Sequence, residues 1–125
     1  MSEVLHLPDF YYTEALKLFI IELSAIITAQ AMKLESSNET EEYKVSKRRE
    51  LNQGINLSSK LSNDYKDIIN GEKTMDELDK FVLNSILDNL SKMKRETNSE
   101  EEILEIIDKR MAVAKKFIDE TNKHI

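Results

Sequence analysis

The sequence contains very few residues that interrupt regular backbone structure. Of its 125 residues only two are glycine and one is proline, and none is cysteine or tryptophan. Average usage would place roughly 15 Gly and Pro residues in a chain of this length. So few turn residues leave little room for the many turns of a β-protein and favour long helices. The lack of cysteine excludes a disulfide framework and a thiolate metal site, which fits a reducing compartment.

Residues that usually carry catalysis are also scarce. The only two histidines, His6 and His124, lie near the two ends of the chain, so no single helix contains a two-histidine zinc site. There is no glycine-rich phosphate loop and no glycine-flanked nucleophilic serine. We therefore expect no catalytic residue, no cofactor, no bound metal and no small-molecule substrate. The net charge of −6 argues against gross, charge-driven binding to nucleic acid or to an anionic membrane.

Hydrophobic and charged residues dominate what is present, at 40% and 34% of the chain. This is enough for one core, so residues 1–125 are expected to form a single helical domain. Start and stop signals place helices at about 9–35, 37–70, 74–96 and 99–122. Capping boxes at 36–39 and 74–77 open the second and third segments, and Ser99 opens the fourth.

The links between these segments are short, which predicts neighbouring helices that run antiparallel. The predicted fold is therefore all-α, an antiparallel bundle of about four helices. A kink or break is expected in the second helix near Gly54, where Asn56, Ser58 and Ser59 follow.

Apolar residues at helical spacing predict which faces are buried. The stripe of the third segment consists of Leu78, Val82, Ile86, Leu90 and Met93, and that of the fourth of Ile103, Ile106, Ile107, Ala114, Phe117 and Ile118. The first half of the second segment, from Thr40 to Glu50, is poor in apolar residues. We expect that half to project past the bundle or to pack weakly.

The first helix differs because it is apolar on two sides. Its main stripe, expected in the core, contains Leu16, Phe19, Ile20, Leu23, Ile26, Ile27 and Leu34. A second series lies roughly opposite and contains Leu18, Ile21, Ala25 and Met32. A helix that is apolar all round is normally covered on all sides, so either the arm 4–7 or another chain must cover this series. Burying its large side chains would contribute roughly 1.5–3 kcal/mol each, which predicts self-association as a dimer.

Two polar residues interrupt the apolar stripes. Gln30 lies within the main stripe of the first helix, and Arg110 lies within the stripe of the fourth. A buried arginine needs an Asp or Glu from another helix, whereas one at the edge of a stripe extends its charged end into water. Both residues are candidates for a buried polar contact or an interface.

The densest basic patch lies early in the second segment and consists of Lys44, Lys47, Arg48 and Arg49. One interpretation is a surface that contacts phosphates of nucleic acid or an acidic partner. The other is a solvated helix face neutralised by Glu41, Glu42 and Glu50, and we favour this second interpretation because the segment is neutral overall.

Carboxylates gather on one face of the fourth segment, at Glu101, Glu105 and Asp108. Acidic pairs of this kind hold magnesium in helical nucleotide pyrophosphohydrolases. These three residues point away from the apolar stripe of their helix. We therefore favour a solvated acidic face at the positive end of the helix dipole.

The stretch from Ala15 to Met32 is as long as a membrane span, but it contains Lys17 and Glu22. Because charges within a span are costly, we expect no membrane insertion. Residues 1–6 lack a basic region, so we also expect no signal peptide. The expected location is the cytoplasm.

These features favour a non-enzymatic protein that self-associates and binds a protein partner as an adaptor, inhibitor or chaperone-like binder. The layout of helices joined by tight turns resembles flagellar export chaperones and small helical subunits of CRISPR effector complexes, but no motif residue can be carried over. A small acidic helical protein without a site also resembles phage or plasmid products that occupy another protein, which implies an anti-defence role. The alternatives are a nucleic-acid-associated subunit that uses the basic patch and, less favoured, a metal-dependent nucleotide hydrolase.

Overall fold

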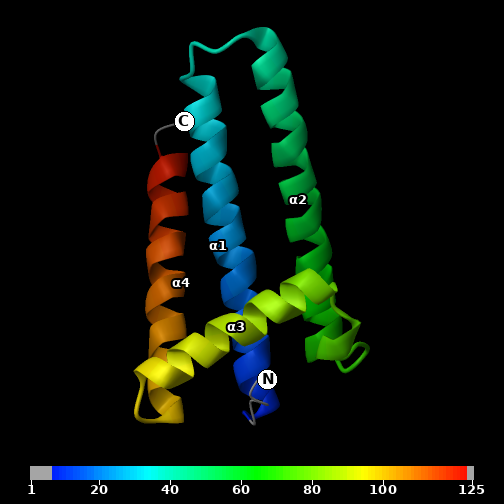
Figure 1. Ribbon diagram of the computed structural model, residues 1–125, viewed down its shortest axis with the longest axis vertical. Helices are drawn as coiled ribbons and strands as arrows, with labels where there is room; N and C mark the ends of the chain where they lie inside the picture. The colour runs from blue at the N-terminus through cyan, green and yellow to red at the C-terminus, as the bar shows by residue number, and fades with distance from the viewer. Residues whose placement is uncertain (1–6, 124–125) are drawn as a thin grey trace.

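The structure, a computed structural model, describes residues 7–123 and is built from helices throughout (Figure 1). Its four α-helices are α1 (Asp9–Glu35), α2 (Glu41–Ile69), α3 (Lys80–Glu96) and α4 (Glu100–Asn122). A short 3₁₀ turn, η1 (Met75–Glu77), precedes α3. No strand occurs within this part of the chain, and the predicted all-α helical bundle is confirmed.

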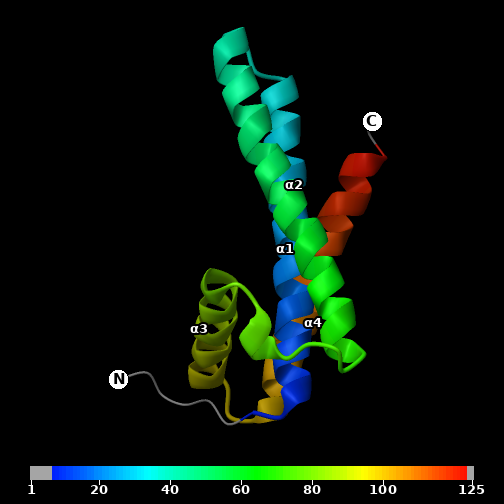
Figure 2. The same cartoon turned by 90° about the vertical axis from the view of Figure 1, so that its right-hand side faces the viewer.

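Helix α1 lies at the centre and contacts all three other α-helices. The antiparallel helix α2 packs on one side of it and α4 on the other, while α3 crosses the lower half of α1 at a steep angle (Figure 1). Because α3 lies across the bundle, α4 begins at the same end as α1 and runs parallel to it. Seen from the side, the three long helices form a twisted layer in which the upper end of α4 diverges from α1 and α2, and α3 lies on one face of this layer, on the side opposite to the one toward which α4 leans (Figure 2). We call the half of the layer that α3 crosses the lower half.

The predicted helix boundaries hold closely for α1 and α4 but not for α2. Helix α2 begins at Glu41 because the hydroxyl of Thr40 accepts a hydrogen bond from the amide of Tyr43 at 3.2 Å. The predicted capping box at 36–39 is therefore wrong. In that link the hydroxyl of Ser37 instead accepts a hydrogen bond from the amide of Glu39.

The predicted third segment divides into two pieces. The capping box of Thr74 and Glu77 is present, but it opens only η1. Leu78 is extended, with φ −68° and ψ 156°, and this interrupts the helical backbone. The carboxylate of Asp79 then accepts the amides of Phe81 and Val82 and starts α3.

Helix α2 runs unbroken past Gly54, so the predicted break is wrong, and Figure 1 shows α2 without a sharp bend. Gly54 lies close against α1: a Cβ atom added to it would lie 3.2 Å from Cδ1 of Ile27. One turn later the hydroxyls of Ser24 and Ser58 lie 3.4 Å apart. The small residues of α2 are therefore explained by close helix packing, not by bending.

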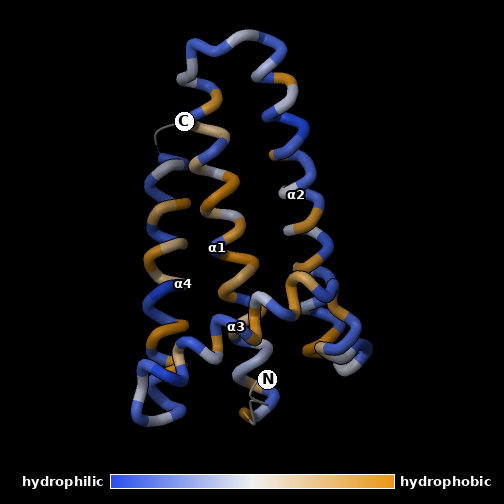
Figure 3. The backbone as a smooth tube through the Cα atoms, viewed as in Figure 1, coloured by the Kyte–Doolittle hydropathy of each residue, from blue (hydrophilic) through white to orange (hydrophobic). Residues whose placement is uncertain are grey.

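The hydrophobic core lies in the lower half, between α3 and the layer. Its most deeply buried side chains, at 1% exposure or less, are Leu16, Leu61, Val82, Ile86, Leu90, Ile103 and Ile107. All five residues of the stripe predicted for the third segment are buried. The upper half has no crossing helix, and along residues 19–33 of α1 no side chain is fully buried although the stretch is strongly apolar (Figure 3).

Candidate functional site

The second apolar stripe predicted for α1 is divided between the core and the surface. Leu18 is 2% exposed and belongs to the core of its own chain, so it is not available to a partner and the prediction is wrong for this residue. Ile21 and Ala25 are half-buried, and Met32 is 47% exposed. Leu7 of the arm proposed as a cover is buried, while residues 4–6, like His124, lie outside the described residues.

The main stripe of α1 is also less buried than its pattern predicts. Leu16 and Leu34 are buried, but Ile26 is 53% exposed and the residues between them are only half-buried. The reason is the crossing of α3, which covers the lower half of α1 and leaves the upper half open (Figure 2). In an ordinary helical bundle a neighbouring helix would bury this part of the stripe, and here it is left partly exposed.

A groove runs between the upper halves of α1 and α4 and has a volume of about 620 Å³. Its apolar lining consists of Ala25, Ile26 and Ala29 from α1 with Val113, Ala114 and Phe117 from α4. Val113 is 70% exposed and Phe117 is 39% exposed. We call this set of six residues and the space between them the α1–α4 groove. The sequence pattern placed Phe117 in the core, and its exposure follows from the absence of a covering helix in the upper half.

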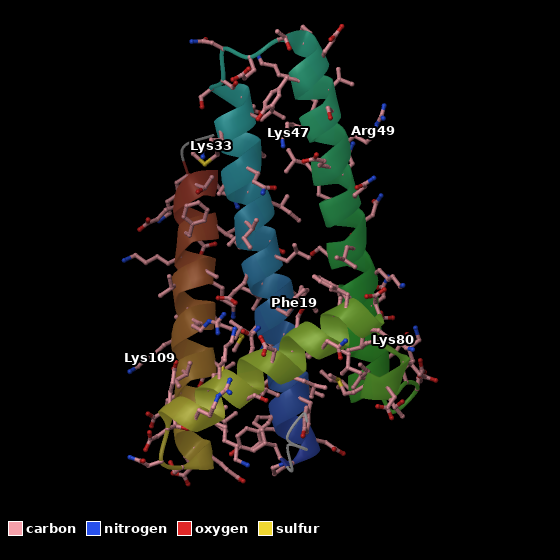
Figure 4. The ribbon with its side chains drawn as sticks, viewed as in Figure 1. Phe19, Lys33, Lys47, Arg49, Lys80 and Lys109 are labelled. Carbon is pink, nitrogen blue, oxygen red and sulfur yellow. The ribbon has the colours of Figure 1, made fainter. Side chains whose placement is uncertain are left out.

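The groove opens on the face of the layer that α3 occupies. Ile26 follows Phe19 by seven residues, which is close to two helical turns, so both lie on the same side of α1. Figure 4 shows Phe19 where α3 crosses α1. Ile21 follows Phe19 by two residues, or about 200°, and therefore lies on the opposite face. The exposed apolar surface is thus centred elsewhere than on the predicted stripe.

An ion pair closes the lower end of the groove. Arg110 of α4 donates from Nη2 to Oε1 of Glu22 at 2.6 Å and from Nε to Oε2 at 3.1 Å. The two side chains are 38% and 32% exposed, so the pair is neither buried nor fully solvated. Arg110 therefore lies at the edge of its apolar stripe and has a carboxylate partner from another helix. The bidentate geometry fixes the relative position of α1 and α4 at this level.

Gln30 is exposed, so its predicted place inside the core is wrong. It lines a second hollow of about 520 Å³ between the end of α1 and the start of α2, together with Lys33, Leu34, Tyr43 and Lys47 among others. The reason is again that no helix crosses the upper half. This hollow contains both cationic and anionic side chains and has no single chemical preference.

Arg49 lies apart from Lys47 in the basic patch of α2, while Lys44, Lys47 and Arg48 keep the three- and four-residue spacing of one helix face. Lys47 lies over the ring of Tyr43 at 5.5 Å and pairs with Glu50 at 3.3 Å. In Figure 4, Lys47 points toward α1, whereas Arg49 points away on the outer side of α2. Two residues advance a helix by about 200°, which separates these two charges. Lys44 is half-buried and Arg48 is exposed.

The acidic residues of α4 predicted as a solvated face, Glu101, Glu105 and Asp108, are all exposed. Within residues 7–123 no group of three or more His, Asp or Glu side chains is placed to hold a metal ion.

An ion pair between the buried Asp64 and the exposed Lys73, which the sequence pattern does not reveal, links α2 to the loop after it. Asp64 is 5% exposed, and Nζ of Lys73 donates to its Oδ1 at 2.8 Å and lies 3.9 Å from Asp67. The hydrogen bond to Asp64 raises the pKa of Lys73. The pair holds the turn at 70–74, which contains Gly71 with φ +79°, against the end of α2. Its role is therefore structural, and Lys73 also lines a hollow of about 510 Å³ between the start of α1, the loop after α2 and α3.

By length and composition, one helix within the described residues, α1, is apolar enough to cross a membrane. A single such helix is weak evidence, because core helices of other proteins pass the same test. The chain matches no protein-family profile, no curated protein and no solved structure. The α1–α4 groove is therefore interpreted from its own residues.

Proposed function

We propose that this protein is a non-enzymatic protein-binding module that acts in the cytoplasm as an adaptor, inhibitor or chaperone-like binder and uses the α1–α4 groove to bind protein. The observation that carries the proposal is the exposure of Ile26, Val113 and Phe117 around a hollow lined by alanines. The largest contiguous apolar patch on the surface of a protein is often an interaction site.

The composition of the groove favours a protein ligand over a small molecule. Its six lining residues are all apolar, and charged groups stand only at its edge, at Glu22, Lys109 and Arg110. A small-molecule site usually adds convergent polar groups that fix the orientation of its ligand. An apolar centre with a charged edge is instead the usual composition of a protein interface.

The same features favour protein over lipid. The ion pair of Glu22 and Arg110 lies midway along α1, where a membrane-spanning arrangement would place it in hydrocarbon. Helix α1 also contacts three other helices, which cover its lower half. The open apolar surface is therefore a short patch over two helices and not a belt around one.

The proposal is tested by comparing three forms of the full chain as bait in the native host. These are the unchanged chain, Ile26→Glu in the groove, and Ala112→Glu, which adds the same charge at an exposed position of α4 that does not line the groove. We expect a protein that is retained by the unchanged chain and by Ala112→Glu and lost by Ile26→Glu. Purified, it should bind the purified chain directly with the same ranking in calorimetry.

Two results would contradict the proposal. One is a set of bound proteins that does not differ between Ile26→Glu and Ala112→Glu. The other is flotation of the unchanged chain with neutral lipid vesicles that Ile26→Glu abolishes, since this would assign the patch to lipid.

A further inference from the structure

The surface of the α1–α4 groove has protruding and recessed side chains next to each other. We propose that a second copy of this chain occupies the groove, in an antiparallel two-fold dimer in which α1 and α4 of both copies form a four-helix bundle. This inference rests on the proposed function, because it names the protein that the groove binds.

The shape of the groove suits a two-fold interface. In such an interface the same patch meets itself, so each contact occurs twice and the patch must supply both the protruding and the receiving residues. Ile26 and Val113 protrude at 53% and 70% exposure, while Ala25 and Ala29 line the hollow between the helices. Two parallel helices that turn such a face toward an identical pair bury it as the core of a four-helix bundle.

The exposed area fits a weak dimer. Ile26, Val113 and Phe117 leave on the order of 300 Å² of apolar surface open on each copy, the size of the largest patch on a typical monomer. The exposed Ala29 and the half-buried Ala25 extend this face. Two copies together would bury roughly 600 Å² from these three side chains, and this places the interface in the small, weakly associating class below about 1,200 Å².

Charges at the two ends of the groove select the antiparallel orientation. Lys109 stands at the lower end, and Glu120 follows it on α4 by eleven residues, close to three turns, so both lie on one side of the helix. Within the described residues neither side chain has an ion-pair partner. An antiparallel partner centred between Val113 and Phe117 places Lys109 of one copy opposite Glu120 of the other. A parallel two-fold partner would instead set α4 of one copy against α1 of the other, so Lys109 and Glu120 would not meet.

Helix α3 sets the register of the two copies. It lies on the same face of the layer as the groove and occupies the lower half, so a second copy fits only against the upper half (Figure 2). The antiparallel arrangement places the two α3 helices at opposite ends of the shared bundle, whereas a parallel one would bring them together. Shape, area, charge and the position of α3 thus lead to the same dimer.

The first experiment measures the oligomeric state of the full chain by sedimentation equilibrium up to about 200 µM, a range that detects dissociation constants tighter than roughly 1 mM. We expect a monomer–dimer equilibrium. Val113→Glu should weaken it about 100-fold or more, because each dimer loses two buried valines and gains two buried charges. Ala112→Glu, the neighbouring exposed position outside the groove, should leave it unchanged. Circular dichroism of each variant confirms that the fold is retained.

A second experiment tests the orientation by exchanging charges. Lys109→Glu and Glu120→Lys should each weaken the dimer about 3- to 10-fold, and the double variant should restore it, since the pair is rebuilt with its signs reversed. A double variant weaker than both single variants would overturn the antiparallel register.

The two proposals fail separately. A chain that stays monomeric at 200 µM, yet retains a different protein that Ile26→Glu loses, would overturn the second copy as occupant and leave the proposed function intact. A dimer that Val113→Glu weakens no more than Ala112→Glu would overturn the assignment of the groove.

Discussion

At the scale of single residues, Gly54 allows α1 and α2 to pack closely because glycine has no side chain. A glycine within a helix costs about 1 kcal/mol relative to alanine, so its presence in the middle of α2 requires a compensating contact. That contact is Ile27, whose side-chain atoms Cδ1 and Cγ1 lie 3.2 and 3.3 Å from where a Cβ atom would stand. Crowding against α1 therefore opposes the gain in helix propensity.

We predict that Gly54→Ala changes the free energy of unfolding by less than about 0.5 kcal/mol, because the two effects nearly cancel. In the background of Ile27→Ala, where the crowding atoms are gone, the same substitution should stabilise by about 1 kcal/mol. Urea unfolding of the four proteins measures the coupling between the two sites. An identical effect of Gly54→Ala in both backgrounds would mean that Ile27 does not restrict this position.

Lys73 gives the chain a pH-dependent contact at the end of α2. Its pKa is raised above the ordinary value of 10.5 by the hydrogen bond to Asp64. A lysine whose pKa is higher in the folded state stabilises the fold fully below its unfolded pKa, and this contribution is lost as the pH rises through the folded value. Burial likewise raises the pKa of Tyr11, which adds a loss of stability in the same alkaline range.

We predict that Lys73→Met is less stable than the unchanged chain at pH 8 and that the difference shrinks above about pH 10.5. Because Tyr11 is present in both proteins, its contribution cancels in the difference. Thermal unfolding between pH 8 and 11.5 measures it, with Lys66→Met, an exposed lysine of α2, as the control. A difference that stays constant over this range would show that the ammonium charge of Lys73 does not stabilise the fold.

At the scale of elements, α1 is one continuous helix with two environments. Its lower half packs under α3, where Leu16 has no exposed surface, while its upper half leaves Ile26 half exposed. The apolar pattern of the sequence is equally strong in both halves. Packing, and not the pattern, therefore decides how much each residue contributes to stability.

We predict that Leu16→Ala lowers the free energy of unfolding by about 2–5 kcal/mol, as for other fully buried leucines. Ile26→Ala should lower it by about 1 kcal/mol or less, because much of that side chain is already in contact with water. Urea unfolding at low micromolar concentration, where any dimer is dissociated, provides the comparison. Equal losses for the two variants would contradict the division of α1 into two environments.

The comparison of elements also shows what could be predicted from the sequence. The bounds of α1 and the buried stripe of α3 follow from local signals, namely the start and stop signals of each helix and apolar residues at helical spacing. The crossing of α3 does not, because it depends on the extended conformation of Leu78, which separates η1 from α3. Since that crossing determines which half of α1 is covered, the α1–α4 groove could not be found from periodicity. The one residue in the sequence that could have indicated the groove is Val113, an apolar residue that lies outside every predicted stripe and is exposed in the structure.

At the scale of the whole molecule, the core is concentrated at one end. The lower half contains every side chain buried to 1% exposure or less, and the upper half is a layer of three helices without a fourth. Regions with few buried apolar contacts open locally at a lower free energy than the core. An isolated chain should therefore be least protected in the upper halves of α1, α2 and α4, and binding at the groove should change this for α1 and α4 in particular.

We predict that hydrogen exchange reports this difference as a function of concentration. Raising the protein from about 2 to 200 µM should slow exchange of the backbone amides at 22–33 and 110–120, because dimerisation stabilises the bound state by mass action. The exchange rates of the amides of α3 and of residues 10–18 should not change with concentration, except where those amides exchange only through unfolding of the whole chain. In Val113→Glu the upper amides should exchange at the fast rate at every concentration. An interface at the groove should make the exchange rate depend on concentration only in these two segments. Slower exchange spread evenly over the whole chain would instead indicate that the copies associate elsewhere.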